Sequence, residues 1–600
     1  MIFIQIRYFD YDENRGIQNQ MQEQIIETDV LVIGGGGAGE RAALEAKKRG
    51  VSTTIVIKGK LGESGCTARA VSELSAYSAA LGDSDPRDKP YFHFRDTVDQ
   101  GRFLANQKLI RILAEEAPNR FKELVEMGAR FKKRGDKFEQ LLADASSIPR
   151  ACHFGADTGR EIASTLKKEI LRSGIRVIEN ILITKLLTFE KTVVGATGIR
   201  MDTDEFVTFK AKSVVLATGG GGQLFSLNAQ PPDVTGDGFA LAYDTGADLV
   251  NMEFIQIGPA LVHPVKGYLL VTNFWKLSPR IYNKNKEEIL AKYLPPNLSP
   301  EEIFIAKQFA FPFMFGYPAM YLDIAMQNEI KKGNGTEHNG IYLDVSHNSL
   351  EKIKSEVPVS YKWLKEKGID ISKQPIEIAP VVQCFIGGVS FNEHAESTIP
   401  GLYVCGEVSG GAHGAARPGG NLLAISQVFG FIAGREAAKR ALPIEKIRID
   451  HSEIEKEKKR IFGWLKKDGK DPEEIIKRIQ KIMWENVSVV RNKGSLEATL
   501  KELDRIKSKD LSAIGISGEE NLYKAVVVEN MVKVAELITR AALLRSESRG
   551  CHYREDFPFT DNFHWVKTIH MRLEDGKAKT SLMNPVEVSN FYIKEREELY

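Results

Sequence analysis

The chain has 600 residues, enough for roughly three or four domains and at least one large hydrophobic core. With 42% hydrophobic and 27% charged residues, the composition excludes a disordered or fibrous protein. The 82 basic and 80 acidic side chains leave a formal net charge of +2, so no long-range electrostatic field favours nucleic acid or an anionic membrane as a partner.

The cysteines and the apolar runs limit the kind of protein further. The five cysteines are Cys66, Cys152, Cys384, Cys405 and Cys551. Their odd number and wide spacing predict neither a disulfide framework nor a zinc or iron–sulfur ligand set, and they fit a reducing cytoplasm. No apolar run reaches the length of about 18 residues that a membrane span needs. Residues 1–27 lack the apolar segment of a signal peptide, so we predict an N-terminal extension there.

The first motif begins where residues 28–39 form an apolar strand followed by a glycine-rich turn. Gly34, Gly36 and Gly39 have the spacing of a dinucleotide-binding turn, and residues 40–49 have helix-forming composition. Such glycines permit a tight turn, a close approach to a pyrophosphate, and close packing of helix on strand. The second strand ends in Lys58 rather than in the acidic residue that usually binds a ribose, which argues against an ordinary NAD site.

Two later segments repeat this pattern of an apolar strand running into glycines. The first covers residues 213–222, and the second covers residues 401–407 and ends in Gly406-Glu407. A glycine-rich loop follows the second strand and leads into an apolar helix at Leu422. A glycine-rich loop that feeds a helix N-terminus suits an anionic or flavin ligand.

Together, these segments resemble the FAD site of the succinate dehydrogenase/fumarate reductase flavoprotein family, a plan that L-aspartate oxidase shares. The resemblance spans roughly residues 28–575 and implies an FAD-dependent oxidoreductase that transfers hydride between a substrate and the flavin. Further matching segments are 96–128, 155–159, 235–238, 342–344, 387–389 and 548–552.

The resemblance also implies a fold. We expect an α/β protein with a Rossmann-like FAD-binding domain at 28–248 and 360–440, interrupted by an α+β capping domain at 249–359. A C-terminal helical domain should occupy 441–575, where Lys/Glu-rich periodic segments are typical of amphipathic helices. A charged tail should follow at 576–600.

The resemblance assigns a set of residues to FAD binding. They are Gly34, Gly36, Gly37, Ala38, Gly39, Lys58, Ser64, Gly65, Cys66, Thr67, Ala217, Thr218, Gly219, Gly220, Asp237, Gly406, Glu407, Arg417, Asn421 and Leu422. Many quinone-linked members bond the flavin covalently through a histidine that precedes a threonine. This chain has Cys66 before Thr67, so we predict non-covalent FAD, with a cysteinyl bond as the alternative.

The substrate-handling residues depart from the family pattern. Arg417 stands in place as a carboxylate clamp, because its planar fork binds carboxylates bidentately. Gly258 and Gln383 replace the two family histidines, and Ala319 replaces the arginine that transfers a proton. An alanine cannot act as a general acid, so fumarate reduction by the usual mechanism is not expected. The candidate catalytic residues are therefore Arg417 and Gln383, with His263 and Arg280 as substitutes if the loop is re-registered.

Three functions follow from these residues. The leading one is an FAD-dependent oxidoreductase that acts on a non-standard substrate and passes electrons to a separate iron–sulfur subunit. The second is ordinary succinate/fumarate or L-aspartate chemistry with relocated residues, and the third is a non-catalytic flavin electron relay. We expect a cytoplasmic protein that binds a small molecule, binds no nucleic acid and meets a membrane only through partner subunits.

Overall fold

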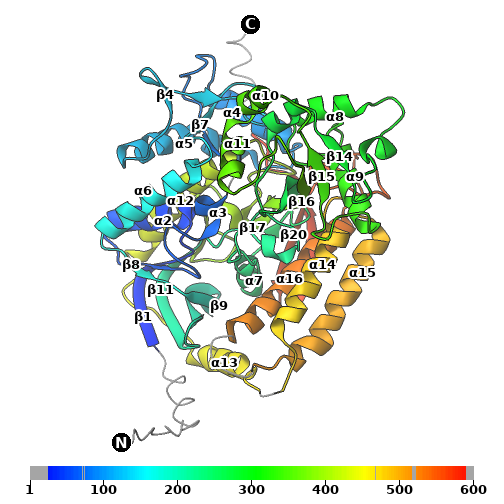
Figure 1. Ribbon diagram of the computed structural model, residues 1–600. Helices are drawn as coiled ribbons and strands as arrows, with labels where there is room; N and C mark the ends of the chain where they lie inside the picture. Colours follow the sequence, from blue (N-terminus) through cyan, green and yellow to red (C-terminus); the bar gives the residue numbers. More distant parts are fainter. Residues whose placement is uncertain (1–23, 71, 73–74, 467, 517–521, 589–600) are drawn as a thin grey trace, which may run out of the picture.

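The computed structural model describes residues 24–70, 72, 75–466, 468–516 and 522–588 (Figure 1). Most of the predicted extension at 1–27 therefore lies outside the described residues, and residues 24–27 belong to the first strand. Among the described residues, no helix combines the length and the hydropathy that a membrane span would require.

A seven-stranded sheet forms the centre of the half that is predicted to bind FAD, in the order β8-β2-β1-β11-β10-β9 with β18 also paired to β11. Its strands are β1 (Gln24–Ile33), β2 (Thr53–Val56), β8 (Arg176–Ile178), β9 (Ile181–Phe189), β10 (Thr192–Arg200), β11 (Phe206–Leu216) and β18 (Leu402–Val404). Strands β8, β2, β1, β11 and β18 are parallel, whereas β9 and β10 form an antiparallel edge. Continuous burial of Val30 to Ile33 explains why that strand reads as an unbroken apolar run.

The register of the central strands brings the glycine-rich segments together. Ile33, the last residue of β1, pairs with Leu216, the last residue of β11. The turn after β1 and the turn after β11 therefore leave the sheet at the same edge, and the Ala217 amide donates to the Ile33 carbonyl at 2.8 Å. Ligands of open parallel sheets bind at this carboxyl edge.

Helices cover this sheet. The elements of this half are α2 (Gly37–Lys48), α3 (Gly65–Arg69), α4 (Pro90–Gln100), α5 (Gln107–Glu126), α6 (Thr158–Arg172), α7 (Asp237–Asp244) and α12 (Asn421–Ala441), with the short strands β3 (Ala76–Ser78), β4 (Lys133–Arg134), β5 (Lys137–Phe138), β6 (Gln140–Leu141) and β7 (Ala151–His153). Helix α12 packs on both α2 and α5, and Gly430 and Gly434 let its backbone approach the backbone of α2.

The inserted region contains an antiparallel sheet in the order β13-β16-β15-β14. Its elements are β13 (Ile255–His263), β14 (Arg280–Tyr282), β15 (Ile341–Asp344), β16 (Ile376–Phe385), α8 (Pro300–Lys307), α9 (Met320–Lys331), α10 (Leu350–Glu356) and α11 (Pro358–Glu366). Strand β16 pairs with β13 along its length, although it lies in the segment from residue 360 that is predicted to belong to the FAD-binding domain. This pairing joins strands from the two sides of the boundary at 359, which stays a prediction.

The C-terminal helices are α13 (His451–Phe462), α14 (Pro472–Val487), α15 (Lys493–Arg505) and α16 (Leu522–Leu544). Helices α14, α15 and α16 pack on one another along one flank, whereas α13 contacts β9 and α16 (Figure 1). Helix α16 is buried on most of its surface and contacts α7 of the FAD-binding half.

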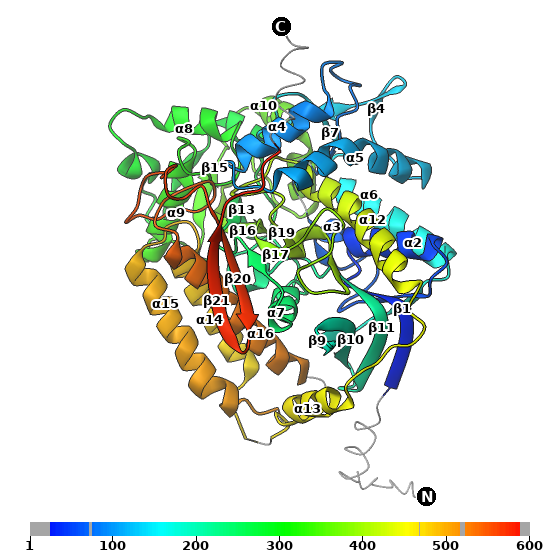
Figure 2. The same cartoon turned by 180° about the vertical axis from the view of Figure 1, so that it is seen from behind.

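A second mixed sheet joins the end of the described chain to the middle of the sequence. Its order is β19-β17-β12-β20-β21, with β12 (Leu249–Val250), β17 (Gly388–Ser390), β19 (Ser409–Gly410), β20 (Thr568–Glu574) and β21 (Lys577–Met583). Figure 2 shows β20 and β21 as a red hairpin. The predicted tail at 576–600 therefore begins with a strand, because Lys577 to Met583 pair with β20.

Candidate functional site

A long cavity follows the carboxyl edge of the central sheet and has an empty volume of about 1740 Å³, including its opening to solvent. One end begins at the turn after β1. There, Gly34 has φ +112°, and a Cβ on Gly39 would lie 1.9 Å from the Gly34 carbonyl oxygen. This turn therefore excludes side chains at both positions, as a close approach to a phosphate requires.

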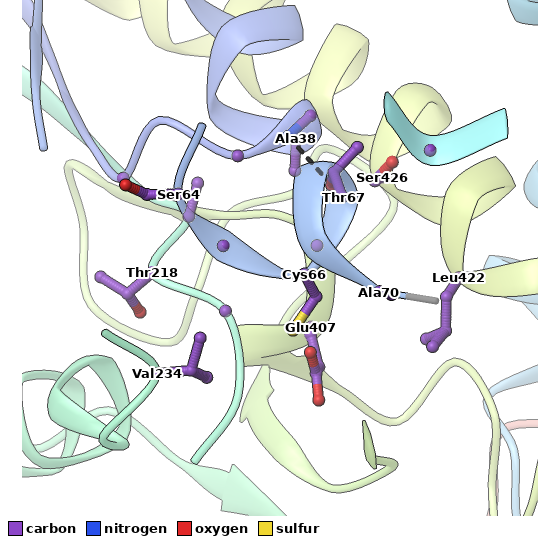
Figure 3. Close-up of a pocket in the computed structure, with 18 of the residues that line it drawn as sticks. Ala38, Ser64, Cys66, Thr67, Ala70, Thr218, Val234, Glu407, Leu422 and Ser426 are labelled. Atoms are coloured by element: carbon purple, nitrogen blue, oxygen red, sulfur yellow. Dashed lines mark hydrogen bonds between the residues drawn. The ribbon is translucent and has the colours of Figure 1, made fainter. Parts of the chain in front are cut away.

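The N-terminus of α2 faces this end of the cavity, where Gly36, Gly37 and Ala38 line the wall. No side chain caps the helix from Gly36, its N-cap residue, and the Gly37 amide donates to Thr67 Oγ1 at 3.2 Å (Figure 3). First-turn amides and the helix dipole attract an anion to such a position.

The opposite wall comes from the turn after β11 and the loop before α7. Ala217, Thr218 and Gly219 line it together with Asp233 and Val234. Thr218 Oγ1 is buried without a hydrogen-bond partner among the described residues. A buried hydroxyl normally has a hydrogen-bond partner, so the wall offers this group to a ligand.

Lys58 and Asp237 form an ion pair in the cavity wall, with 2.9 Å between Lys58 Nζ and Asp237 Oδ2. Asp237 also accepts from Asn530 Nδ2 of α16 at 2.9 Å. Burial alone would raise the pKa of Asp237, but Lys58, Thr235 and Asn530 together hold that pKa below its ordinary value. The Asp237 carboxylate therefore stays charged, and its hydrogen bond with Asn530 connects α16 to the cavity wall.

Cys66 and Glu407 lie side by side in the middle of the cavity (Figure 3). Glu407 accepts from the Phe385 amide at 2.9 Å and from Gln230 Nε2 at 2.6 Å, and burial raises its pKa. Burial, with a smaller contribution from Glu407, raises the pKa of the Cys66 thiol well above its usual value. Cys66 is consequently a thiol, which is a poor nucleophile for attack on a flavin.

The far end of the cavity gathers polar atoms that have no hydrogen-bond partner among the described residues. They are Arg417 Nε, Asp144 Oδ1 and Gln383 Oε1. Burial raises the pKa of Asp144 to about 6, although Arg417 and Lys307 act in the opposite direction. Phe311 supplies apolar surface to the same cavity. This end therefore presents a guanidinium, a carboxyl and an amide within a partly apolar wall.

The structure separates the four candidate catalytic residues. Arg417 and Gln383 line the cavity, whereas neither His263 nor Arg280 does. His263 ends β13 and Arg280 is an exposed residue of β14, so neither is in position to replace the missing residues. His263 stays at the end of β13, after a register shift in its pairing with β16, and the structure does not bring it to the position of Gly258.

Of the three replaced positions, Gly258 and Ala319 lie outside the cavity lining, whereas Gln383 belongs to it. A Cβ on Gly258 would lie 2.9 Å from the Phe311 ring, so that ring occupies the space of a side chain there. Ala319 is buried at the start of α9 and does not line the cavity.

Three of the residues assigned to FAD do not line the cavity and have structural roles. Gly39 packs against the turn after β1, and Gly220 leaves room for the Glu407 carboxylate. Asn421 is buried beside α4, where its Oδ1 lies 2.8 Å from His93 Nε2 and its Nδ2 donates to Thr97 Oγ1 at 3.1 Å. The remaining residues of the set line the cavity.

Sequence reasoning missed Asp144 and Phe311, which come from separate irregular segments. Asp144 follows the short strand β6, and Phe311 follows α8. The local signal for Asp144 is one acidic residue directly after Leu141, Leu142 and Ala143, which does not reveal where that loop points.

Comparisons with known proteins agree with this geometry. The family model described as an FAD binding domain matches residues 29–423, and the model of the fumarate reductase flavoprotein C-terminus matches residues 476–600. The chain belongs to the succinate dehydrogenase/fumarate reductase flavoprotein family. As a member of this family, it is an FAD-dependent oxidoreductase.

Several members of the family are similar over nearly the whole chain. A fumarate reductase (CoM/CoB) subunit of Methanothermobacter marburgensis is 37% identical, over 92% of this chain and 98% of that protein. The structure of Mycobacterium smegmatis Sdh1 in complex with UQ1 is 30% identical with a TM-score of 0.85, over 96% of this chain and 98% of that chain. The Escherichia coli quinol fumarate reductase structure is 25% identical with a TM-score of 0.81, over 94% of this chain and 98% of that chain.

The cavity of this flavoprotein fits FAD. The α2 N-terminus and the side-chain-free turn suit the pyrophosphate, and the unpaired Thr218 hydroxyl lies on the opposite wall. When bound, FAD supplies an isoalloxazine ring that accepts or donates hydride. The protein supplies the binding surface, the exclusion of water and the polar groups at the far end of the cavity.

Proposed function

We propose that this flavoprotein oxidises or reduces an organic acid other than free fumarate or succinate, and that it passes electrons to a separate iron–sulfur subunit. The observation that carries the proposal is the set of unpaired atoms on Arg417, Asp144 and Gln383 at the far end of the cavity. Arg417 can bind a substrate carboxylate, and Asp144 can accept a hydrogen bond from a hydroxyl or ammonium group.

The missing residues support the exclusion of fumarate. Gln383 can hydrogen-bond but cannot carry charge, and neither Gly258 nor Ala319 can donate a proton. Loss of a general acid lowers a rate by roughly 10²- to 10⁴-fold. Asp144 also disfavours a substrate that would place a second carboxylate beside it, because like charges repel.

The proposed partner follows from the need to remove electrons from a buried flavin. The chain has five cysteines, all of them free, and four of them are buried. None belongs to a candidate metal cluster among the described residues. The Methanothermobacter marburgensis relative is named as one subunit of its enzyme, which supports a partner chain for this protein as well. Any contact with a membrane would then pass through such partners.

A second candidate is oxidation of L-aspartate, whose ammonium group would be the donor to Asp144. The L-aspartate oxidase of Streptomyces coelicolor is 30% identical over 92% of this chain, which supports this candidate. The relay function is less favoured, because a pocket that had lost its substrate would not need to keep three polar groups that each have an atom without a partner.

The first experiment is to reduce the bound flavin anaerobically, add fumarate and follow the absorbance of oxidised flavin. We expect reoxidation no faster than in buffer. In a parallel experiment, the oxidised protein is mixed with 2-hydroxy acids and with L-aspartate. Bleaching by a 2-hydroxy acid supports the proposal, and bleaching by L-aspartate alone supports the second candidate. Rapid reoxidation by fumarate overturns the proposal.

Arg417→Ala tests the clamp. Because Arg417 also lines the FAD cavity, the flavin content of the variant is measured first. In the flavin-loaded variant we expect binding of the active acid to weaken by about 1.5–3 kcal/mol, because a hydrogen bond to a charged group is lost. The matched control is Arg160→Ala, which removes a surface arginine that is paired with Asp157. Equal binding by the two variants would rule out Arg417 as the clamp.

A further inference from the structure

His263, which does not reach the cavity, belongs to a different group of side chains. It lies beside His338 and Glu377, and one potential ligand atom from each residue falls within 4.8 Å of the others. None of the three lines the FAD cavity. Hydride transfer in the FAD cavity therefore does not involve these three residues.

The fold brings the three residues together from separate segments of the capping region. His263 is the last residue of β13 and pairs across the sheet with Glu377 of β16. His338 comes from the segment between α9 and β15, and its ring stacks on the His263 ring with 3.7 Å between centroids and 9° between planes. The sheet register thus fixes two of the residues, and the stack places the third.

Neighbouring polar groups orient the carboxylate. Thr336 Oγ1 donates to Glu377 Oε2, and it accepts from the Gly340 amide at 3.0 Å. His338 Nδ1 lies 3.1 Å from both carboxylate oxygens of Glu377. Metal ligands are commonly held in this way by neighbouring groups, which fix the direction of their lone pairs.

We propose that His263, His338 and Glu377 bind a divalent transition-metal ion, for which Zn²⁺ is the best match. Two imidazoles and one carboxylate are a usual zinc ligand set, whereas Mg²⁺ and Ca²⁺ prefer oxygen ligands alone. Zinc bonds of about 2.0 Å at tetrahedral angles place ligand atoms about 3.3 Å apart. The 3.1 Å between His338 Nδ1 and Glu377 fits this spacing. The His263 ring must turn out of its stack on His338 to join them, because the lone pairs of two parallel rings point along parallel planes and do not meet at one ion.

The site remains open to solvent on one side, because the His338 side chain is 34% exposed. Water can therefore complete the coordination of the ion, and the exposed Glu337 carboxylate lies 3.8 Å from His338 Nε2. The ion would fasten the end of β13 to the segment before β15. After His263 the chain turns back, so that the Leu261 amide donates to the Tyr268 carbonyl at 3.0 Å and Leu269 reaches the cavity.

The test uses the full-length flavin-loaded protein after treatment with a chelator and gel filtration. Titration calorimetry with Zn²⁺ should show one site per chain, and Mg²⁺ should produce no comparable binding. We expect His338→Ala and Glu377→Gln each to weaken Zn²⁺ binding at least about tenfold, and Thr336→Val to weaken it by about 10- to 100-fold. His347→Ala is the matched control, because it removes an exposed histidine of the same region outside the cluster.

Flavin absorbance and the melting temperature of each metal-free variant show whether it has folded. If His338→Ala fails to fold, His263→Gln provides a second variant with a smaller change in volume. X-ray absorption of the zinc-loaded protein should show imidazole scattering and a nitrogen and oxygen shell at about 2.0 Å. The proposal is overturned if the wild-type protein binds no Zn²⁺, or if the cluster variants bind it as tightly as His347→Ala does.

Discussion

The charge of Asp144 depends on the burial of its carboxyl group in the cavity. Burial raises its pKa to about 6, against opposing contributions from Arg417 and Lys307, while an exposed aspartate in the unfolded chain has a pKa of about 3.9. Between these two values the folded protein binds more protons than the unfolded chain. The free energy of unfolding therefore falls as pH rises from about 4 to about 6, by up to roughly 3 kcal/mol.

Asp144→Asn should remove this contribution. In urea unfolding of the flavin-free protein, we expect the stability difference between the variant and the wild type to grow in favour of the variant as pH rises through this window. A difference that does not change with pH would show that the carboxyl titrates normally and is not buried as described.

Gly39 and Gly494 offer a matched pair of glycine substitutions. A Cβ on Gly39 would lie 1.9 Å from the Gly34 carbonyl oxygen, whereas a Cβ on Gly494 would come no closer than 3.5 Å to a neighbour. We expect Gly39→Ala to lose most of its flavin, because the turn beneath the pyrophosphate must move. Gly494→Ala should retain the wild-type ratio of flavin absorbance to protein absorbance.

Cys66 bears on how the flavin is held. Burial and Glu407 keep the pKa of its thiol well above the usual value, and so few molecules carry the reactive thiolate. Acid precipitation of the wild-type protein should therefore release all of its flavin into the supernatant. Flavin fluorescence in the precipitate that disappears in Cys66→Ala would reveal a cysteinyl bond instead.

At the scale of elements, helices α8 and α9 are joined by a buried ion pair. Lys307 Nζ lies 2.6 Å from Asp323 Oδ2, and both side chains are fully buried. Lys307→Met should destabilise the protein by about 3–5 kcal/mol in urea unfolding, because it leaves the carboxylate without its partner. The double variant Lys307→Met with Asp323→Leu should recover most of this loss, and the exposed Lys331→Met is the control.

Some parts of the candidate site can be predicted from the sequence, and others cannot. The turns after β1 and β11 can be predicted because their backbone geometry requires glycine, and that requirement is visible in the residues themselves. Nothing comparable marks Asp144 or Phe311, since the direction of an irregular loop depends on distant packing. His263 is near Gly258 in the sequence, but β13 carries it away from the cavity.

Pairing between strands that are far apart in the sequence also limits what can be predicted from the sequence. The resemblance predicts a boundary between the capping region and the second FAD-binding segment near 360, whereas β16 pairs with β13 in one sheet. Residues 576–600 are predicted to be a charged tail, yet residues 577–583 form the exposed outer strand β21, whose position beside β20 needs no apolar face. Both differences arise from long-range pairing that local composition does not report.

At the scale of the whole molecule, the FAD cavity draws on segments from Ile33 to Ser426, and α16 adds Asn530 through Asp237. Asn530→Ala should therefore affect flavin binding from a distance. We expect it to release flavin at a lower temperature than the wild type, because burial would then raise the pKa of Asp237 with less opposition. Flavin fluorescence during heating measures this, and an unchanged release temperature would mean that the helical flank does not support the cavity.

The hairpin of β20 and β21 completes a sheet that β12 begins near the middle of the chain. On the ribosome, β12 emerges long before its partner β20 has been synthesised, and it must wait with an unpaired edge. The flavin pocket has the same dependence, since its walls need α12 as well as β1. The nascent chain therefore cannot complete this sheet or the flavin pocket until late in its synthesis. Cofactor insertion therefore belongs to a late stage of maturation, when exposed edges make the polypeptide a natural client of chaperones.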